Sequence, residues 1–151
     1  MSNTEILVPV DFSDCSRVAA EHGLRLADQL GGSVTLLHAL CGDPPTVAPI
    51  DYVAFPPETE VVEKANRELA EFTTSLESEG VDVAQVVVTG YPATAILDRI
   101  KANPPRMVVM GTLGRTGLAR LVMGSQAVEV VRRSEVPVLV VRAPETASAK
   151  P

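Results

Sequence analysis

The segment most suited to binding a ligand is residues 110–125, MGTLGRTGLARLVMGS, which contains Gly111, Gly114, Gly124 and Ser125. Glycine is costly in ordered backbone, so a cluster of glycines indicates unusual dihedral angles or the close approach of another group. Backbone N–H groups at glycines can turn toward an anion without obstruction by a side chain. If a helix begins at Gly124 and Ser125, its free N–H groups and its dipole favour negative charge there. The spacing Gly-x2-Gly-x9-Gly-Ser therefore suits a phosphate group.

This glycine segment matches neither of two familiar phosphate-binding patterns. Gly-x-x-x-x-Gly-Lys-Ser/Thr is absent, Gly-x-Gly-x-x-Gly is absent as well, and the segment follows a late apolar run rather than the first one. Two interpretations stay open. In one, the loop binds phosphate and the Ser125 hydroxyl donates to a phosphate oxygen. In the other, the segment is a structural turn from strand to helix, and Ser125 is an ordinary helix N-cap.

Other polar residues offer less chemistry. Asp11 directly follows the apolar run EILVPV, where it would either contact a ligand or cap the helix that follows. His38 ends a second apolar run and is interpreted as a core residue rather than a base, and His22 is expected on a helix surface. Because these two histidines lie far apart in the sequence, we predict no metal cluster and no Ser-His-Asp set.

The bulk composition narrows the class of protein. The chain is 46% hydrophobic with a net charge of −6, which indicates a globular protein and argues against nucleic acid as a partner. No apolar run approaches the ~20 residues that cross a bilayer, so we predict no membrane association. The N-terminus lacks the basic region of a signal peptide, and Cys15 and Cys41 lack metal-type spacing, so we expect a reduced cytoplasmic protein.

Charge is distributed unevenly along the chain. Residues 1–98 carry 4 basic and 16 acidic side chains, whereas residues 99–151 carry 9 basic and 3 acidic side chains. The glycine segment lies in the positive part. This asymmetry suits an anionic ligand, but a charge-paired dimer surface would produce it equally well.

The elements that must position these residues alternate along a single domain. The pattern of apolar residues predicts strands at 5–10, 34–40, 81–90, 106–111 and 136–144, helices at 15–30, 58–79, 91–103 and 125–134, and a proline-rich loop at 41–57. Short apolar strands that alternate with helices indicate an α/β fold with a parallel sheet covered on both faces. Ligands of such sheets bind beyond the carboxyl ends of the strands, where the strand order reverses. If the first and fourth strands are neighbours, Asp11 faces the glycine segment.

Several motifs in the correct order resemble the universal stress protein family. They are Gly-x2-Gly-x9-Gly-Ser ahead of PVLVV, ILVPVDFS at the start, LLHA at the end of the second strand, and the Gly90-Tyr-Pro92 turn; together they span residues 5–142. The resemblance implies a doubly wound, Rossmann-like, five-stranded parallel sheet of order 3-2-1-4-5. It also implies a domain over 1–144 and a homodimer paired through the last strand, Val136–Val141. The Ala, Ser, Thr, Lys and Pro residues of 145–151 predict a disordered tail.

The glycine signature marks the members of this family that bind ATP. By resemblance, Pro9 and Val10 would lie beside the adenine, the backbone of Ala39 would meet the adenine edge, and Asp11 would lie near the ribose or a nucleotide-bound Mg²⁺. Ribose and phosphate contacts would come from Met110, Gly111, Gly114, Gly124, Ser125 and Gln126. Two residues depart from the family pattern: Leu113 stands where a histidine is common, and Gln126 stands where a small apolar residue is usual. Gln126 would either add an amide donor or crowd the site.

The favoured function is a cytoplasmic, dimeric stress-response protein that binds an adenine nucleotide (ATP, ADP or AMP) and acts on an unidentified protein partner. The first alternative is a ligand-free dimeric module that acts through its surfaces. The second is a slow ATPase or self-phosphorylating protein. No clearly placed arginine finger, catalytic lysine or base other than Asp11 is evident in the sequence. Few groups are therefore evident that could stabilise charge or activate water in phosphoryl transfer, and we do not assign an enzyme.

Overall fold

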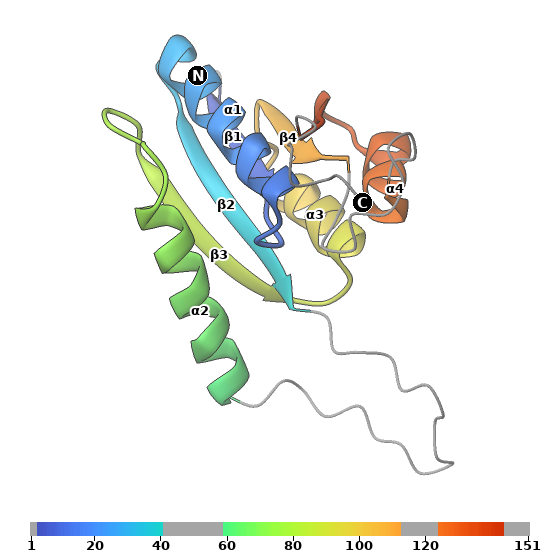
Figure 1. The fold of residues 1–151 in the computed structure, drawn as a ribbon. Coiled ribbons are helices and arrows are strands. Elements are labelled where there is room, and N and C mark those ends of the chain that lie inside the picture. Colours follow the sequence, from blue (N-terminus) through green and yellow to red (C-terminus); the bar gives the residue numbers. More distant parts are fainter. Residues whose placement is uncertain (1–2, 41–58, 113–123, 144–151) are drawn as a thin grey trace, which may run out of the picture.

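The structure is a computed structural model in which residues 3–40, 59–112 and 124–143 are described. The predicted loop 41–57, the predicted tail 145–151, Cys41, Leu113 and Gly114 lie outside these ranges. The described elements follow the predicted alternation of strands and helices (Figure 1). Their bounds are β1 Glu5–Pro9, α1 Asp14–Leu30, β2 Ser33–Leu40, α2 Thr59–Thr74, β3 Val83–Thr89, α3 Pro92–Ala102, β4 Met107–Gly111, α4 Ser125–Arg133 and β5 Val138–Val141.

The strands form one five-stranded sheet in the order β3-β2-β1-β4-β5, and every neighbouring pair is parallel. This arrangement confirms the predicted α/β fold and strand order. β1 pairs with β2 through Val8 and Leu36 and with β4 through Leu7 and Val108. The chain therefore winds outward from β1 in both directions, and the strand order reverses between β1 and β4. The carboxyl ends of these two strands are the expected place for a ligand.

Each face of the sheet is covered by a pair of helices. Ile6 and Val8 of β1 belong to a core that includes Ala19 and Leu24 of α1 and Leu69 of α2. The intervening Leu7 belongs to a second core, which the α3 residues Ala93, Ile96, Leu97 and Ile100 and the α4 residues Ala127 and Val130 share. Successive strand residues point to opposite faces, so the unbroken apolar run of β1 is what a sheet covered on both faces requires.

The ends of α1 follow from local capping. Ser13 is the N-cap, and its hydroxyl accepts a hydrogen bond from the backbone N–H of Ser16 at 3.2 Å. Gly31 ends the helix in the left-handed conformation with φ of 66°, as the Gly31-Gly32 pair predicts. The helix start therefore belongs to Ser13, and Asp11 lies ahead of it.

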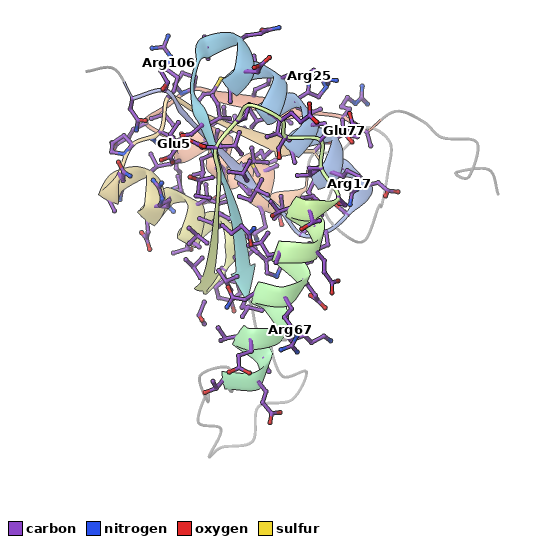
Figure 2. All side chains as sticks on the ribbon, turned by 90° about the vertical axis from the view of Figure 1, so that its left-hand side faces the viewer. Glu5, Arg17, Arg25, Arg67, Glu77 and Arg106 are labelled. Carbon is purple, nitrogen blue, oxygen red and sulfur yellow. The ribbon has the colours of Figure 1, made fainter. Side chains whose placement is uncertain are left out.

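α2 ends at Thr74, five residues before the predicted end of the helix at 79. The hydroxyls of Thr73 and Thr74 donate to the carbonyls of Leu69 and Ala70, and the Ser75 hydroxyl donates to the carbonyl of Phe72 at 2.6 Å. Such side-chain bonds compete with the helical ladder and favour its end. Arg17 of α1 donates to the Ser75 hydroxyl at 2.9 Å, and Figure 2 shows this side chain beside the end of α2.

The last strand is shorter than the predicted 136–144, and two apolar helix residues lie at the surface. Leu30 and Val61 are 46% and 45% exposed, because each lies in the terminal turn of its helix. The predicted last strand, 136–144, is shortened to β5, Val138–Val141. Among the described residues its only neighbouring strand is β4, which pairs with it from Val138 to Val141. Val136 still packs against the second core.

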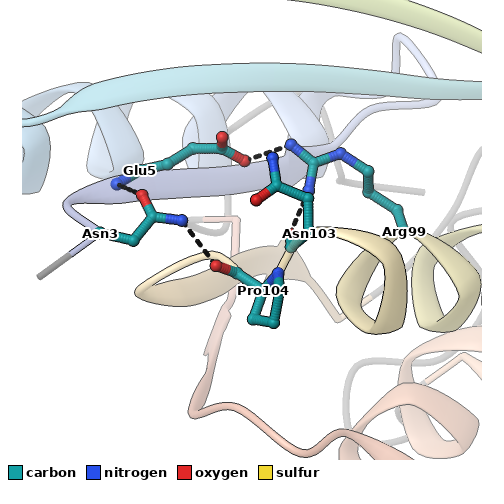
Figure 3. A network of polar contacts seen from close by, with 5 residues as sticks. All are labelled: Asn3, Glu5, Arg99, Asn103 and Pro104. Carbon is teal, nitrogen blue, oxygen red and sulfur yellow. Dashed lines mark hydrogen bonds and ion pairs between the residues drawn. The ribbon is translucent and has the colours of Figure 1, made fainter. Parts of the chain in front are cut away.

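A polar network ties the start of β1 to the end of α3 (Figure 3), at the opposite end of the strand from its carboxyl end. Arg99 donates to a Glu5 carboxylate oxygen at 2.6 Å, and their side chains are 19% and 15% exposed. Arg99 also donates to the backbone carbonyl of Asn103, and Asn3 donates to the carbonyl of Pro104 at 2.6 Å. This network anchors the start of the first strand, far from the end of the sheet where ligands of such folds bind.

Candidate functional site

A cavity of about 360 Å³ lies at the carboxyl ends of β1 and β4, where the strand order reverses. Its volume falls in the range of about 300–1,000 Å³ typical of small-molecule sites. The cavity brings together every predicted site residue that the structure describes: Pro9, Val10, Asp11, Ala39, Met110, Gly111, Gly124, Ser125 and Gln126. The tenth predicted residue, Gly114, lies outside the described ranges.

The sequence analysis assigned no ligand contact to the remaining residues around the cavity. They are Ser16, Leu37, His38, Pro92, Ile96, Thr112 and Ala127. Pro92 and Ile96 show that α3 forms one wall. The Gly90-Tyr-Pro92 turn was the available signal, because it places the start of a helix directly after a strand end. Ile96 itself carries no signal beyond its apolar helical spacing.

Asp11 shapes the turn between β1 and α1. One carboxylate oxygen accepts the backbone N–H of Ser13 at 3.0 Å, and the N–H of Asp11 lies 3.4 Å from the Ser16 hydroxyl. This Asx-type bond organises the turn, while Ser13 provides the cap. The alternative in which Asp11 is itself the helix cap is therefore wrong. Its carboxylate lies at the cavity, with part of its hydrogen-bonding capacity committed to the turn.

Phe12 holds the turn in place by packing. Its φ of 67° is a left-handed conformation that is rare for a bulky residue. The Phe12 ring lies 4.5 Å from the His38 ring and 5.8 Å from the Phe72 ring, measured between centroids. These contacts with β2 and α2 offset the cost of the left-handed backbone at Phe12. They thereby fix the turn that follows Asp11.

His38 is a satisfied core residue, as the sequence analysis expected. It is 7% exposed, and its Nδ1 lies 2.8 Å from the carbonyl oxygen of Val10. A carbonyl can only accept, so Nδ1 carries the proton of this hydrogen bond. The bond holds the end of β1 against the end of β2, and it thus sets the separation between Val10 and Ala39 at the cavity.

Close approach accounts for Gly111, and neither of the two described glycines of the signature has a left-handed backbone. A Cβ on Gly111 would lie 2.7 Å from Cys15 Sγ and 3.1 Å from the Cys15 backbone. Gly124 has φ of −58°, and its N–H donates to the carbonyl of Thr112 at 2.6 Å. Gly111 thus lets α1 sit directly on the end of β4. Cys15 is buried in that contact, and its thiol donates to the carbonyl of Val141 at 3.5 Å.

α4 begins at the cavity. Its N-cap is Gly124, and Ser125 is its first residue, so the alternative in which Ser125 is the N-cap is wrong. The N-cap makes no side-chain hydrogen bond, and the first turn contains no acidic residue. The first N–H groups of an α-helix have no intrahelical partner, so those of Ser125, Gln126 and Ala127 are available at this end. The helix dipole adds partial positive charge there.

Gln126 reaches from α4 to α3. Its side-chain oxygen accepts the backbone N–H of Ala93 at 2.8 Å. The N-cap of α3 is Tyr91, which makes no side-chain cap bond, so Gln126 supplies the cap for a neighbouring helix. A contact between residues 33 positions apart leaves no local signal in a sequence, so the role of Gln126 could not be predicted.

The electrostatics of the described lining favour an anion despite the scarcity of charged side chains. Among the described lining residues, Asp11 is the only carboxylate, and none is lysine or arginine. The positive potential comes instead from the N-termini of α3 and α4, neither of which has an acidic residue in its first turn. The described residues include no group of three or more His, Cys, Asp or Glu side chains able to hold a metal ion. They also contain no helix with the length and apolar character needed to cross a bilayer.

Comparison with known proteins finds both a related sequence and solved structures of similar fold. The chain is 29% identical over 148 residues to universal stress protein MJ0531 of Methanocaldococcus jannaschii, with 93% of this chain and 83% of that protein covered. A universal stress protein from Archaeoglobus fulgidus in complex with dAMP superimposes with a TM-score of 0.67 at 22% identity, covering 93% of this chain and 98% of that one. A universal stress protein in complex with cAMP superimposes with a TM-score of 0.65 at 19% identity, covering 95% of this chain and 100% of that one.

The match to a family model extends over nearly the whole described structure. The model described as "Universal stress protein family" matches residues 3–142, from two residues before β1 to the residue after β5. The fold and the strand order agree with that match. The chain belongs to the universal stress protein family.

Proposed function

We propose that this protein binds an adenine nucleotide in the cavity at the carboxyl ends of β1 and β4. The observation that carries the proposal is the convergence of nine residues, predicted from the family resemblance, on one cavity at the point where the strand order reverses. Relatives of the same fold that were solved with dAMP and with cAMP support an adenine nucleotide as the ligand class. Among adenine nucleotides we propose ATP, with ADP and AMP as the further candidates.

In the proposed complex, the base and the phosphates occupy different parts of the cavity. Val10 and Ala39, at the adjacent ends of β1 and β2, form the adenine side, where apolar surface and backbone groups meet the base. The phosphates lie at the start of α4, where backbone N–H groups and the Ser125 hydroxyl are available. The orientation follows from the separation of apolar strand ends from a positive helix terminus.

Asp11 is the residue best suited to the ribose or to a cation carried by the nucleotide. Carboxylates accept hydrogen bonds from ribose hydroxyls, and Mg²⁺ is commonly held by one or two carboxylates together with the phosphates of the ligand. The single carboxylate of the described lining fits the second arrangement. In that arrangement Asp11 would hold Mg²⁺, which would neutralise charge on the phosphates. In the other arrangement Asp11 would accept hydrogen bonds from the ribose hydroxyls.

We propose a binding role rather than catalysis. Phosphoryl transfer relies on cations that stabilise charge on the transferred group, commonly lysine, arginine and metal ions. The described lining residues include neither lysine nor arginine. In the proposed complex the nucleotide is held mainly by backbone groups and helix termini. We propose that it acts as a regulatory ligand in a stress response in the cytoplasm.

We further propose that the protein acts as a homodimer paired along Val136–Val141. β5 lies at an edge of the sheet, and Leu139 on it is 37% exposed. An edge strand with apolar side chains is a natural surface for pairing with a second copy. The same edge favours the alternative of a ligand-free dimeric module, which predicts a dimer but no nucleotide binding.

Calorimetric titration with ATP, ADP, AMP and cAMP tests the binding proposal. Ser125 is exposed at the cavity, so Ser125→Trp should fill its mouth without entering the core. Gln85→Trp is the matched control, because Gln85 is exposed on β3 and aromatic residues suit strands. We expect at least one nucleotide to bind the wild type and the control and to lose most of its affinity for Ser125→Trp. Absence of binding by the wild type would refute the proposal, and equal binding by all three proteins would refute the location.

A further inference from the structure

We propose that Gln126 is a specificity-determining residue, whose carboxamide is held by α3 so that its N–H donors serve a phosphate oxygen of the bound ligand. The inference rests on the proposed function and deepens it, because it names the side chain that selects phosphorylated adenine ligands over unphosphorylated ones. It concerns a position where this chain departs from the small apolar residue usual in its family. It also decides between the two roles left open for Gln126, an added donor or an obstruction.

The contact with Ala93 fixes which end of the carboxamide faces α3. A backbone N–H is a donor only, so the atom 2.8 Å from the Ala93 nitrogen must be the side-chain oxygen of Gln126. The amide nitrogen is then on the other arm of the planar group and cannot exchange places with the oxygen without loss of this bond. Among the described residues, no hydrogen bond to the amide nitrogen of Gln126 is found. Both of its N–H donors are therefore available.

The surroundings of Gln126 favour an anionic acceptor for these donors. Gln126 lies in the first turn of α4 and lines the cavity beside Ser125. The contact joins the N-terminal turns of α3 and α4, so two helix dipoles present their positive ends in the same region. Neither first turn contains an acidic residue that would neutralise this potential. Donors without a competing carboxylate at a positive helix end suit a phosphate oxygen.

Packing holds the two helix starts together, and the hydrogen bond to Ala93 orients the carboxamide of Gln126, which is itself an exposed residue. Ala93, the donor to Gln126, and Ala127, the next residue along α4, are 5% and 3% exposed and belong to the same core. The relative position of the two helix starts is therefore set by buried small residues. The carboxamide bridges a gap of fixed width, which preorganises its donors before the ligand arrives.

Gln126→Glu separates the two roles of the side chain. A glutamate keeps an oxygen for the Ala93 N–H, and its charge at the start of α3 is favourable, so we expect an unchanged or higher melting temperature. The same substitution removes both N–H donors and adds a negative charge beside the phosphate. We expect the affinity for AMP to fall at least about tenfold, while the affinity for adenosine stays within about twofold. Gln85→Glu, the same chemical change on the exposed face of β3, should leave both affinities unchanged.

Calorimetry with AMP and adenosine on the three proteins gives distinct outcomes. If the wild type binds AMP and Gln126→Glu binds it equally well, the role of Gln126 is refuted while the proposed function stands. If AMP and adenosine lose affinity equally, the donors do not serve the phosphate and the inference is refuted. If the wild type binds neither AMP nor adenosine, the inference is refuted, and the proposed function fails with it only if ATP and ADP do not bind either.

Gln126→Met keeps the experiment decisive if the glutamate variant does not fold. Methionine has a similar length but neither donor nor acceptor, so we expect a lower melting temperature from the lost cap and a weaker affinity for AMP, by about threefold to tenfold. The titration is run well below the melting temperature of the variant. An AMP affinity equal to that of the wild type would refute the role of Gln126.

Discussion

Gly111→Ala is the substitution whose effect the structure defines most closely. The added Cβ would lie 2.7 Å from Cys15 Sγ and 3.1 Å from the carbonyl carbon and oxygen of Cys15. The optimal separation of nonbonded heavy atoms is about 3.5–4.0 Å, so α1 must move away from β4 by roughly 1 Å or the side chain must turn. Cys15 is buried with its thiol bonded to Val141, which leaves little room for rotation.

Overpacking of this kind costs about 1–3 kcal/mol. For a chain of this length, each kcal/mol lowers the melting temperature by about 2–4 °C, so we expect a decrease of about 2–12 °C. Cys15→Ala removes the sulfur but keeps the backbone contacts at 3.1 Å, so it should rescue Gly111→Ala in part. We expect the double variant to be more stable than the sum of the two single effects predicts, by about 1 kcal/mol.

Urea unfolding of the wild type, both single variants and the double variant measures this coupling directly. A Gly111→Ala protein as stable as the wild type would refute the close contact between α1 and β4. Strictly additive effects would show that the cost arises elsewhere than at the sulfur.

Three other substitutions test the remaining parts of the structure. Arg99→Met leaves the largely buried carboxylate of Glu5 without its ion-pair partner, so it should lower the free energy of unfolding by about 1–3 kcal/mol, and a Glu5→Gln/Arg99→Met pair should recover part of that loss in urea unfolding. Ser13→Ala removes the bond to the Ser16 N–H and should cost about 1 kcal/mol, whereas Ser13→Asp should cost little by the same measurement. Leu139→Lys places a charge on the exposed edge of β5 and should shift the proposed dimer to monomer in light scattering at micromolar concentration, with unchanged far-UV circular dichroism. A wild-type protein that is already monomeric would contradict the proposed pairing.

The fold could be predicted in most respects, because the dominant signals are local and repeated. The apolar runs of β1 and β4 and the helical spacing in α1 each identify an element without reference to the rest of the chain. The strand order came from the family resemblance, and the structure confirms it. The end of α2 was misjudged because Leu76 continues the apolar spacing, while the hydroxyls that end the helix act through side-chain bonds that spacing does not reveal.

The candidate site was predictable in its composition but not in its mechanism of assembly. The strand ends supply Val10 and Met110, and their place follows from the topology alone. The reason for glycine at 111 is contact with Cys15, which lies 96 positions away, and the partner of Gln126 lies on another helix. Tertiary contacts of this kind leave no spacing pattern in one sequence. His38 shows the reverse case. Its position at the end of an apolar run was sufficient to predict a core role, and the residue is buried.

The most direct test of the central claim is a map of backbone amide chemical shifts during titration with ATP. We expect saturable shifts concentrated at Asp11, Ala39, Gly111 and the first turn of α4, with smaller changes along α2 and the outer part of β3. Absence of saturable shifts, or shifts centred on the β3 edge rather than on the ends of β1 and β4, would contradict nucleotide binding in this cavity.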